Sequence, residues 1–144
     1  MYNSIKTLLN RLFLPSVLPL LVLAGGCRTA VDQGELAGVY RSTTFIVPGP
    51  ADGPDDVGAR GGFIELRLSS DGTVSGRQHM PQDPEPAADQ VLDGTYTVSG
   101  DTIRFTIGEG TWLAAEPMLL AGDEIRSQRI LRRGAFEIVL RKMR

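Results

Sequence analysis

The chain is poor in the residues that build covalent cross-links, metal centres and nucleophilic active sites. Its 144 residues include one Cys, one His and one Trp. A single Cys excludes an intramolecular disulfide, and one His beside one Cys excludes Cys/His zinc clusters and Cys–His catalysis. The sequence also lacks the G-x-S-x-G motif of serine hydrolases and a Gly-rich loop followed by the Lys that phosphate binding requires. We therefore expect no catalytic residues, no metal site, no cofactor and no enzymatic activity.

A strong net charge is also missing. The chain has 17 acidic and 15 basic residues, a formal charge of −2, so it has no global basic field that would hold it on nucleic acid. The charge is nevertheless uneven, because residues 126–144 contain seven bases and one acid, whereas residues 27–125 contain six bases and 16 acids. Two interpretations of this basic C-terminal hairpin stay open. We favour pairing with acids across the protein surface over contact with an anionic lipid or polymer surface.

The third absence is a long hydrophobic run. The most apolar stretch, Leu12–Ala24, has 13 residues and contains two prolines, whereas a membrane-spanning helix needs about 20 apolar residues. Two basic residues and no acid precede this stretch. A basic start followed by a short apolar segment is typical of an export signal, which the sequence predicts over residues 1–26.

The residues that end this signal, Leu-Ala-Gly-Gly at 23–26, stand directly before Cys27. This arrangement resembles the bacterial lipobox, in which the Cys becomes the new N-terminus and is acylated. The resemblance implies a lipoprotein signal peptide over 1–26, a lipidated Cys and polar tether over 27–35, and membrane attachment through acylated Cys27. Arg28 follows where an Asp would retain the protein in the inner membrane, so the expected location is the outer membrane. The alternative is ordinary cleavage that leaves a soluble periplasmic protein.

The remaining chain, residues 36–144, has the pattern of a β meander. Apolar residues alternate with polar ones, and turn signals recur about every 8–12 residues. Gly and Pro, with 17 and nine copies, supply many of these turns. The predicted strands are 36–47, 62–69, 73–79, 90–99, 102–107, 111–120, 124–133 and 135–143. The predicted fold is all-β, a small up-and-down antiparallel barrel of about eight strands.

Alternation also predicts which side chains enter the barrel. Ile64, Leu66 and Leu68 share one face of their strand, so we expect them in the core. Two Pro-rich acidic insertions, 48–61 and 81–89, interrupt the meander and are predicted to be surface loops that contribute nothing to the core.

A short motif, L-x-G-x-Y, occurs at residues 36–40 and again at 92–96. Glycine lets a neighbouring backbone or side chain come close, and the aromatic residue two positions later lies on the same face. The first copy resembles the G-x-W signature of the lipocalins and of bacterial lipocalin-like lipoproteins, with Tyr40 in the Trp position. The segment 94–105 resembles the central hairpin of those small barrels.

The lipocalin resemblance implies that an Arg near the last strand packs on the motif's aromatic ring and closes one end of the barrel. Arg141 matches by position. If Phe136 and Leu140 face inward, however, Arg141 faces outward, and Arg129 is then the alternative closing residue.

The resemblance also implies a function. We expect the barrel to bind a small apolar ligand or lipid, with Tyr40, Tyr96, Phe105 and Trp112 lining its interior. The same aromatic residues would also fill a packed core, so the alternative is a filled barrel that acts as a structural or interaction module of the cell envelope, without a ligand.

Two weaker candidates for metal binding remain. His79 would need acidic partners from the insertions, and we favour a solvent-exposed His at a strand end. Asp52, Asp55 and Asp56 lie close together in the sequence, but they lack the spacing of a calcium-binding loop.

Overall fold

The structure is a computed structural model that describes residues 31–49, 53–81, 88–114, 116–131 and 134–144. The predicted signal peptide, Cys27 and the beginning of the tether lie outside these residues.

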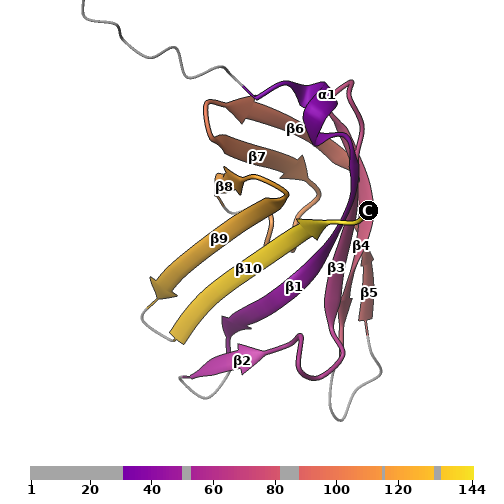
Figure 1. Cartoon of the computed structure of the whole chain (residues 1–144). Coiled ribbons are helices and arrows are strands. Elements are labelled where there is room, and N and C mark those ends of the chain that lie inside the picture. The colour runs from indigo at the N-terminus through magenta and orange to yellow at the C-terminus, as the bar shows by residue number, and fades with distance from the viewer. Residues whose placement is uncertain (1–30, 50–52, 82–87, 115, 132–133) are drawn as a thin grey trace, which may run out of the picture.

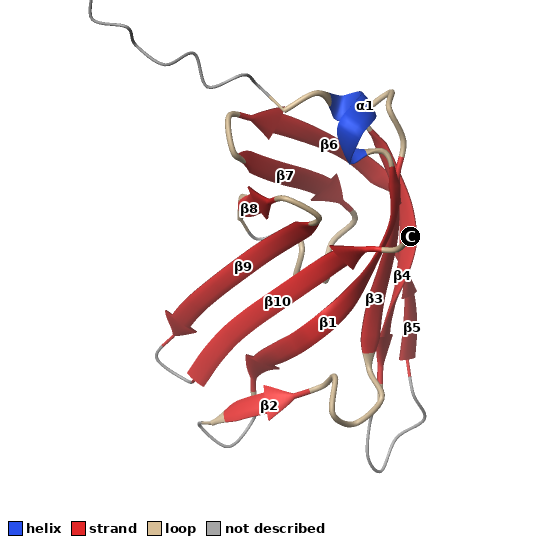
Figure 2. Ribbon diagram, viewed as in Figure 1, coloured by secondary structure: helices blue, strands red, loops and turns tan. Residues whose placement is uncertain are grey.

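Strands make up almost all of the regular structure (Figures 1 and 2). In chain order the elements are α1 (Gln33–Leu36), β1 (Gly38–Pro48), β2 (Pro54–Asp56), β3 (Phe63–Leu68), β4 (Thr73–Met80), β5 (Ala88–Val91), β6 (Gly94–Ser99), β7 (Thr102–Ile107), β8 (Met118–Ala121), β9 (Glu124–Leu131) and β10 (Gly134–Lys142). The predicted all-β class is therefore confirmed.

Eight of these strands close into an antiparallel barrel in the order β1, β3, β4, β6, β7, β8, β9 and β10. Strand β10 pairs back onto β1, with Arg141 opposite Arg41 and Ile138 opposite Phe45. Because neighbours in the barrel follow one another along the chain, the topology is up-and-down, as predicted. The two short strands extend the sheet that forms the barrel wall: β2 pairs with the end of β1, and β5 pairs with the end of β4.

The core fills the inside of the barrel. Among the described residues, nineteen buried hydrophobic side chains belong to one continuous cluster, to which all the barrel strands contribute. Ile64, Leu66 and Leu68 of β3 are all buried, as their alternation predicted, whereas Glu65 and Arg67 lie on the outer side. The alternation of polar and apolar residues in β3 therefore determines which side chains face the core.

The first predicted strand, 36–47, begins two residues too early, and the last residues of the predicted tether, 33–35, belong to a helical turn. Residues Gln33–Leu36 form the helical turn α1, whose N-cap Asp32 accepts a hydrogen bond from the Gly34 amide at 3.0 Å. A side-chain acceptor at this position satisfies an amide that a helix start leaves unpaired. The turn places Leu36 in the core.

The predicted strand 111–120 is wrong over most of its length, because only Met118–Ala121 form a strand there. Thr111 Oγ1 accepts a hydrogen bond from the Leu113 amide at 3.2 Å, and Leu113 is buried. Such a local bond gives the backbone an alternative to the sheet. The segment therefore turns into the barrel instead of pairing along it.

The predicted strand 90–99 is present as two strands, β5 and β6, which both pair with β4. The break falls at Leu92 and Asp93, where the Leu92 amide still reaches the Gly76 carbonyl at 2.9 Å. Figure 1 shows β5 running beside β4 and β6 crossing the end of the barrel near α1, so the chain bends at this break. Strand β5 also takes in Ala88 and Asp89, the last two residues of the insertion predicted as a loop over 81–89.

The insertion 48–61 was predicted to stay outside the core, and this is wrong for one part of it. Residues Pro54–Asp56 pair with β1, and Val57, which follows them, is 0% exposed. Gly62 permits this packing, because a Cβ at this position would overlap the Val57 side chain. The insertion thus adds a short strand and a core residue to the wall.

The two ends of the barrel differ. At the end near α1, tight turns join the strands, and Gly72, Gly100 and Gly122 take the positive φ angles these turns require. We call this the α1 end. At the opposite end, which we call the loop end, β1, β4 and β7 end, and the described segments 57–62 and 108–114 lie there.

Candidate ligand site in the barrel interior

The α1 end is closed by contacts around Tyr40, which is 1% exposed. The Tyr40 hydroxyl donates a hydrogen bond to the Leu36 carbonyl at 3.0 Å. Lys142 Nζ lies 6.0 Å from the centre of the Tyr40 ring and donates a hydrogen bond to the Glu35 carbonyl at 2.7 Å. One lysine therefore joins the last strand, the ring and α1.

Glycine at position 38 makes room for this closure. A Cβ on Gly38 would lie 2.6 Å from Lys142 Cε, so a larger residue would displace the lysine stem. The first copy of the L-x-G-x-Y motif thus performs the task predicted for it, a close approach over glycine beside an aromatic ring.

The closing cation is a lysine, and the prediction of Arg141 or Arg129 for this role is corrected. The guanidinium of Arg141 binds Glu124 on the outer surface, and that of Arg129 pairs with Glu116. Because Phe136, Ile138 and Leu140 all face inward, the next residue of the same parity is Lys142. The alternation of inward and outward side chains along β10 could have identified Lys142 from the sequence.

The second copy of the motif, residues 92–96, also combines a closely approached glycine with a hydrogen-bonded tyrosine at the α1 end. A Cβ on Gly94 would overlap the Thr106 carbonyl oxygen, and Tyr96 donates a hydrogen bond to the Ser69 carbonyl at 2.6 Å. Two of the four predicted ligand-lining residues, Tyr40 and Tyr96, therefore have their hydroxyls engaged by backbone carbonyls.

Burial also keeps these phenols protonated. Loss of solvation raises the pKa of Tyr40 to about 12, with smaller contributions from Tyr96 and from the carboxylate of Asp123. Burial likewise raises the pKa of Tyr96, and the carboxylate of Asp71 adds to the effect. Both hydroxyls thus remain hydrogen-bond donors across the physiological pH range.

A buried polar group without a partner lies toward the other end of the barrel interior. Gln78 is 2% exposed and has the same inward parity on β4 as Val74. Its Oε1 has no hydrogen-bond partner among the described residues. Leaving a buried acceptor unpaired costs about 1–3 kcal/mol, and such groups are rare in folded proteins.

Gln78 is not among the site residues predicted from the sequence. The signal was available, because the inward positions of β4 read Val74, Gly76, Gln78 and Met80, and a glutamine interrupts this otherwise apolar or small series. Polar residues on the inward face of an alternating strand are candidates for ligand contact, since they need a partner there.

The other two predicted lining residues are also placed in the core. Phe105 is buried, and Trp112 packs against Phe136 with ring centroids 5.7 Å apart and planes tilted by 40°. Trp112 lies in the connection after β7, and Phe136 lies near the start of β10, so this aromatic pair belongs to the loop end. Met80, at the end of β4, packs against the same core.

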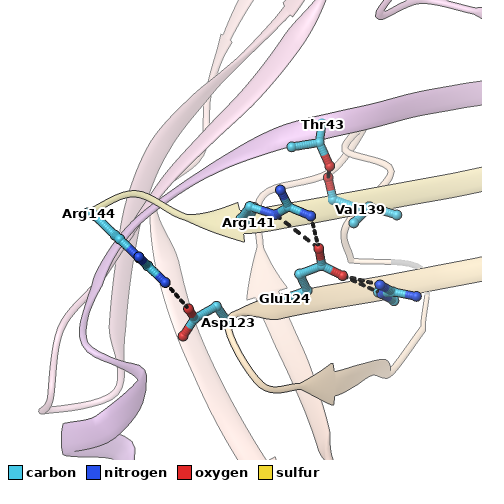
Figure 3. Close-up of polar contacts among 7 residues, drawn as sticks. Thr43, Asp123, Glu124, Val139, Arg141 and Arg144 are labelled. Atoms are coloured by element: carbon cyan, nitrogen blue, oxygen red, sulfur yellow. Dashed lines mark hydrogen bonds and ion pairs between the residues drawn. The ribbon is translucent and has the colours of Figure 1, made fainter.

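The basic C-terminal hairpin is held by acids at the β8–β9 turn and at the start of β9 (Figure 3). Glu124, 8% exposed, accepts hydrogen bonds from Arg141 Nε at 3.0 Å and from Arg126 Nε at 2.7 Å. These two guanidinium groups hold the pKa of Glu124 below its usual value. Arg144 lies 4.0 Å from Asp123.

Together with the pair formed by Arg129 and Glu116, acids therefore face four of the hairpin's basic residues. The partners come from the β8–β9 turn and from the segment before β8, not from the first strand. Arg132 and Arg133 lie outside the described residues.

The weaker metal candidates have other partners. His79 Nδ1 lies 2.5 Å from Asp89 Oδ1, and its ring stacks on Phe63. Asp55 forms two hydrogen bonds with the guanidinium of Arg60, and Asp52 lies outside the described residues. Within the described part of the chain, no group of three or more His, Cys, Asp or Glu residues is placed to hold a metal ion.

Comparison of the chain with protein-family models, with curated proteins and with solved structures gives no match. Among the described residues, no helix is long and apolar enough to cross a membrane. The function is therefore inferred from the geometry of the barrel and from the sequence motifs.

Proposed function

We propose that the protein is a lipid-anchored β-barrel of the bacterial cell envelope that binds a small, mainly apolar ligand or lipid inside the barrel, toward the loop end. The unpaired, buried Oε1 of Gln78 is the observation that carries this proposal. A buried acceptor that has no partner among the described residues is available to a donor on a bound molecule.

The asymmetry of the barrel supports the location. The α1 end is covered by Lys142 and by the hydrogen bonds of Tyr40 and Tyr96, so a ligand enters from the loop end. A barrel of eight strands has an interior just wide enough for packed side chains or one small ligand. The described parts of the two insertions belong to the loop end, where ligand-contacting loops are commonly placed.

The side chains define the ligand chemistry. Trp112, Phe136 and Met80 offer apolar and aromatic surface at the loop end, while Gln78 offers a single unpaired acceptor. The best match is a lipid-like molecule with an apolar body and one hydroxyl or amide N–H donor.

The anchor supports the cellular setting. The lipobox-like residues before Cys27 predict acylation, and the described chain enters the barrel at the α1 end. The tether therefore attaches to the closed end, and the loop end is free to face away from the membrane. The lipocalin-like motif at 36–40, with Tyr40 covered by a cation, agrees with this assignment.

A pair of ligands that differ only in a donor tests the role of Gln78. The full chain in detergent would be titrated with a fluorescent hydrophobic dye, which 1-decanol or decyl methyl ether then displaces. We expect decanol to bind more tightly than the ether, and Gln78→Leu to weaken decanol about tenfold, the equivalent of about 1.4 kcal/mol, without weakening the ether. Gln33→Leu, the same substitution in α1 at the opposite end of the barrel, is the matched control.

Gln78→Leu is also expected to fold at least as stably as the parent protein, because it removes an unpaired buried acceptor. Equal displacement by decanol and the ether in the parent protein would contradict the proposal, as would an unchanged decanol affinity in the variant.

The second candidate, a filled barrel without a ligand, is favoured by one observation. The described buried apolar residues, including Phe105 and Leu113, form one continuous cluster. This function predicts that the folded protein takes up no hydrophobic dye at all.

A further inference from the structure

The barrel wall opens between β1 and β3, outside the interior discussed above. The two strands pair from Gly38 as far as Arg41, which lies opposite Glu65, and β1 next pairs on this side with β2 from Ile46 onward. Ser42 Oγ ends the first ladder by accepting the hydrogen bond of the Ile64 amide at 3.0 Å. A cleft of about 440 Å³ lies at this opening.

The strand on one side of the cleft has an irregular register. The pairing of β1 with β10 shifts between Ser42 and Thr44, so Thr43 is an additional residue on β1. Its Oγ1 donates to the Val139 carbonyl at 3.4 Å (Figure 3). Such bulges redirect side chains and occur frequently beside binding sites. As a result, the hydroxyl-bearing residues Ser42, Thr43 and Thr44 all line the same cleft.

The opposite side of the cleft is a well-bonded segment. Asp56 Oδ1 accepts a hydrogen bond from the Ala59 amide at 2.9 Å, and the Gly58 amide donates to the Phe45 carbonyl at 3.1 Å. The Gly62 amide donates to the Val57 carbonyl at 2.8 Å. These bonds fix the wall before a ligand binds, which lowers the ordering cost of binding.

Phe63 and Arg41 line the cleft, and a second arginine, Arg77, contacts the Phe63 ring. The guanidinium carbon of Arg41 lies 4.7 Å from the centre of the Phe63 ring, and that of Arg77 lies 4.9 Å from it. Glu65 lies opposite both arginines in the sheet, and it reaches Arg41 only at 3.9 Å. Arg41 is 48% exposed, so its guanidinium keeps donors available at the mouth of the cleft.

We propose that this cleft binds one acidic sugar unit, a hexose that carries a carboxylate or phosphate group. Its volume falls within the range of small-molecule sites. The hydroxyls of Ser42 and Thr44 and the carboxylate of Asp56 match the donors and acceptors of sugar hydroxyls. Phe63 offers an apolar ring edge, and Arg41 offers the planar donor pair that suits a carboxylate or phosphate.

Nuclear magnetic resonance of the full chain in detergent tests this site, with four probes: glucuronate, glucose 6-phosphate, glucose and inorganic phosphate. We expect both acidic sugars to shift the backbone amides of residues 41–45 and 58–63, and to bind at least ten times more tightly than glucose or phosphate. Arg41→Gln should weaken the acidic sugars at least tenfold and leave the weak binding of glucose unchanged.

Two further variants keep the result interpretable. Thr44→Val is nearly isosteric and should weaken all three sugars equally, whereas Arg104→Gln, an exposed arginine on β7, should change nothing. The proposal is overturned if the cleft amides do not shift, if inorganic phosphate binds as tightly as the acidic sugars, or if Arg41→Gln binds glucuronate as the parent protein does. Because the barrel interior is a separate site, these outcomes are independent of the Gln78 measurements.

Discussion

Lys142 is the residue on which the closed end of the barrel depends. Its stem passes over Gly38, its ammonium group lies over the Tyr40 ring, and its Nζ binds the Glu35 carbonyl. The ammonium group thus has two partners, an aromatic face and a carbonyl of α1. A single side chain links the last strand to the segment that precedes the first strand.

A substitution that removes the ammonium charge of Lys142 but keeps an aliphatic stem isolates the contribution of the charge to stability. Lys142→Met should lower the free energy of unfolding by about 1–2 kcal/mol, because it loses one cation–π contact and one hydrogen bond. Urea unfolding followed by tryptophan fluorescence measures the change. Arg144→Met is the control, since that side chain is 95% exposed, and it should be neutral. An equal loss in both variants would contradict the closing role of Lys142.

The raised pKa of Tyr40 predicts that the protein loses stability at alkaline pH. Its pKa in the folded protein is about 12, above the ordinary value of 10.0, so the folded state holds the proton that the unfolded state releases. The stabilisation is therefore complete below pH 10 and is lost as the pH rises toward 12. Unfolding midpoints measured across this alkaline range should fall, and Tyr40→Phe should flatten this fall. A profile that Tyr40→Phe leaves unchanged would show that another group is responsible.

At the scale of elements, alternation in the sequence predicted the strands whose two faces differ. The inward set Ile64, Leu66 and Leu68 and the hairpin at Gly100 are examples. The missed features, α1 and the turn at Thr111, each depend on a side-chain oxygen that accepts a nearby backbone amide. Such local bonds compete with a strand, and whether they form is decided by the packing of the chain around them.

The candidate site could be predicted only in part for a related reason. The four aromatic residues were recognised as inward or core residues, but which hydroxyls find partners is a property of the assembled barrel. Tyr40 and Tyr96 donate to carbonyls, whereas Gln78 Oε1 has no partner in the part of the chain that the structure describes. The Val57 contact and the cleft beside β1 likewise require the strand register, which the sequence pattern alone does not determine.

Some glycines in the strands lie so close to a neighbouring backbone that the barrel should not tolerate a side chain at their positions. Gly94→Ala should destabilise the protein by at least about 1–3 kcal/mol, because the new Cβ would overlap the Thr106 carbonyl and force β6 and β7 apart. Thermal unfolding by circular dichroism measures this effect. Gly108→Ala is the matched control, since its Cβ would meet no atom within 4 Å. If both variants unfold at the same temperature, the close approach of β6 and β7 contributes nothing to stability.

At the scale of the whole molecule, the barrel has a closed end, at which the described chain begins, and a loop end opposite to it. We propose that acylated Cys27 attaches this barrel to the membrane. Metabolic labelling with an alkyne fatty acid should mark the parent protein and not Cys27→Ser, and the variant should be recovered in the soluble fraction. Thr29→Ala, a substitution in the tether close to the Cys, is the control and should keep the label. Label retained by Cys27→Ser would contradict the anchor.

Native mass spectrometry of the protein purified from its own host cells tests the central claim, ligand binding inside the barrel, most directly. We predict a bound species of one small, lipid-like molecule per chain, present in the parent protein and in Gln33→Leu and depleted in Gln78→Leu. A chain that carries no bound molecule beyond the mass of residues 27–144 and the acyl groups predicted for Cys27, in the parent and in the variants alike, would contradict ligand binding and leave the filled barrel as the function.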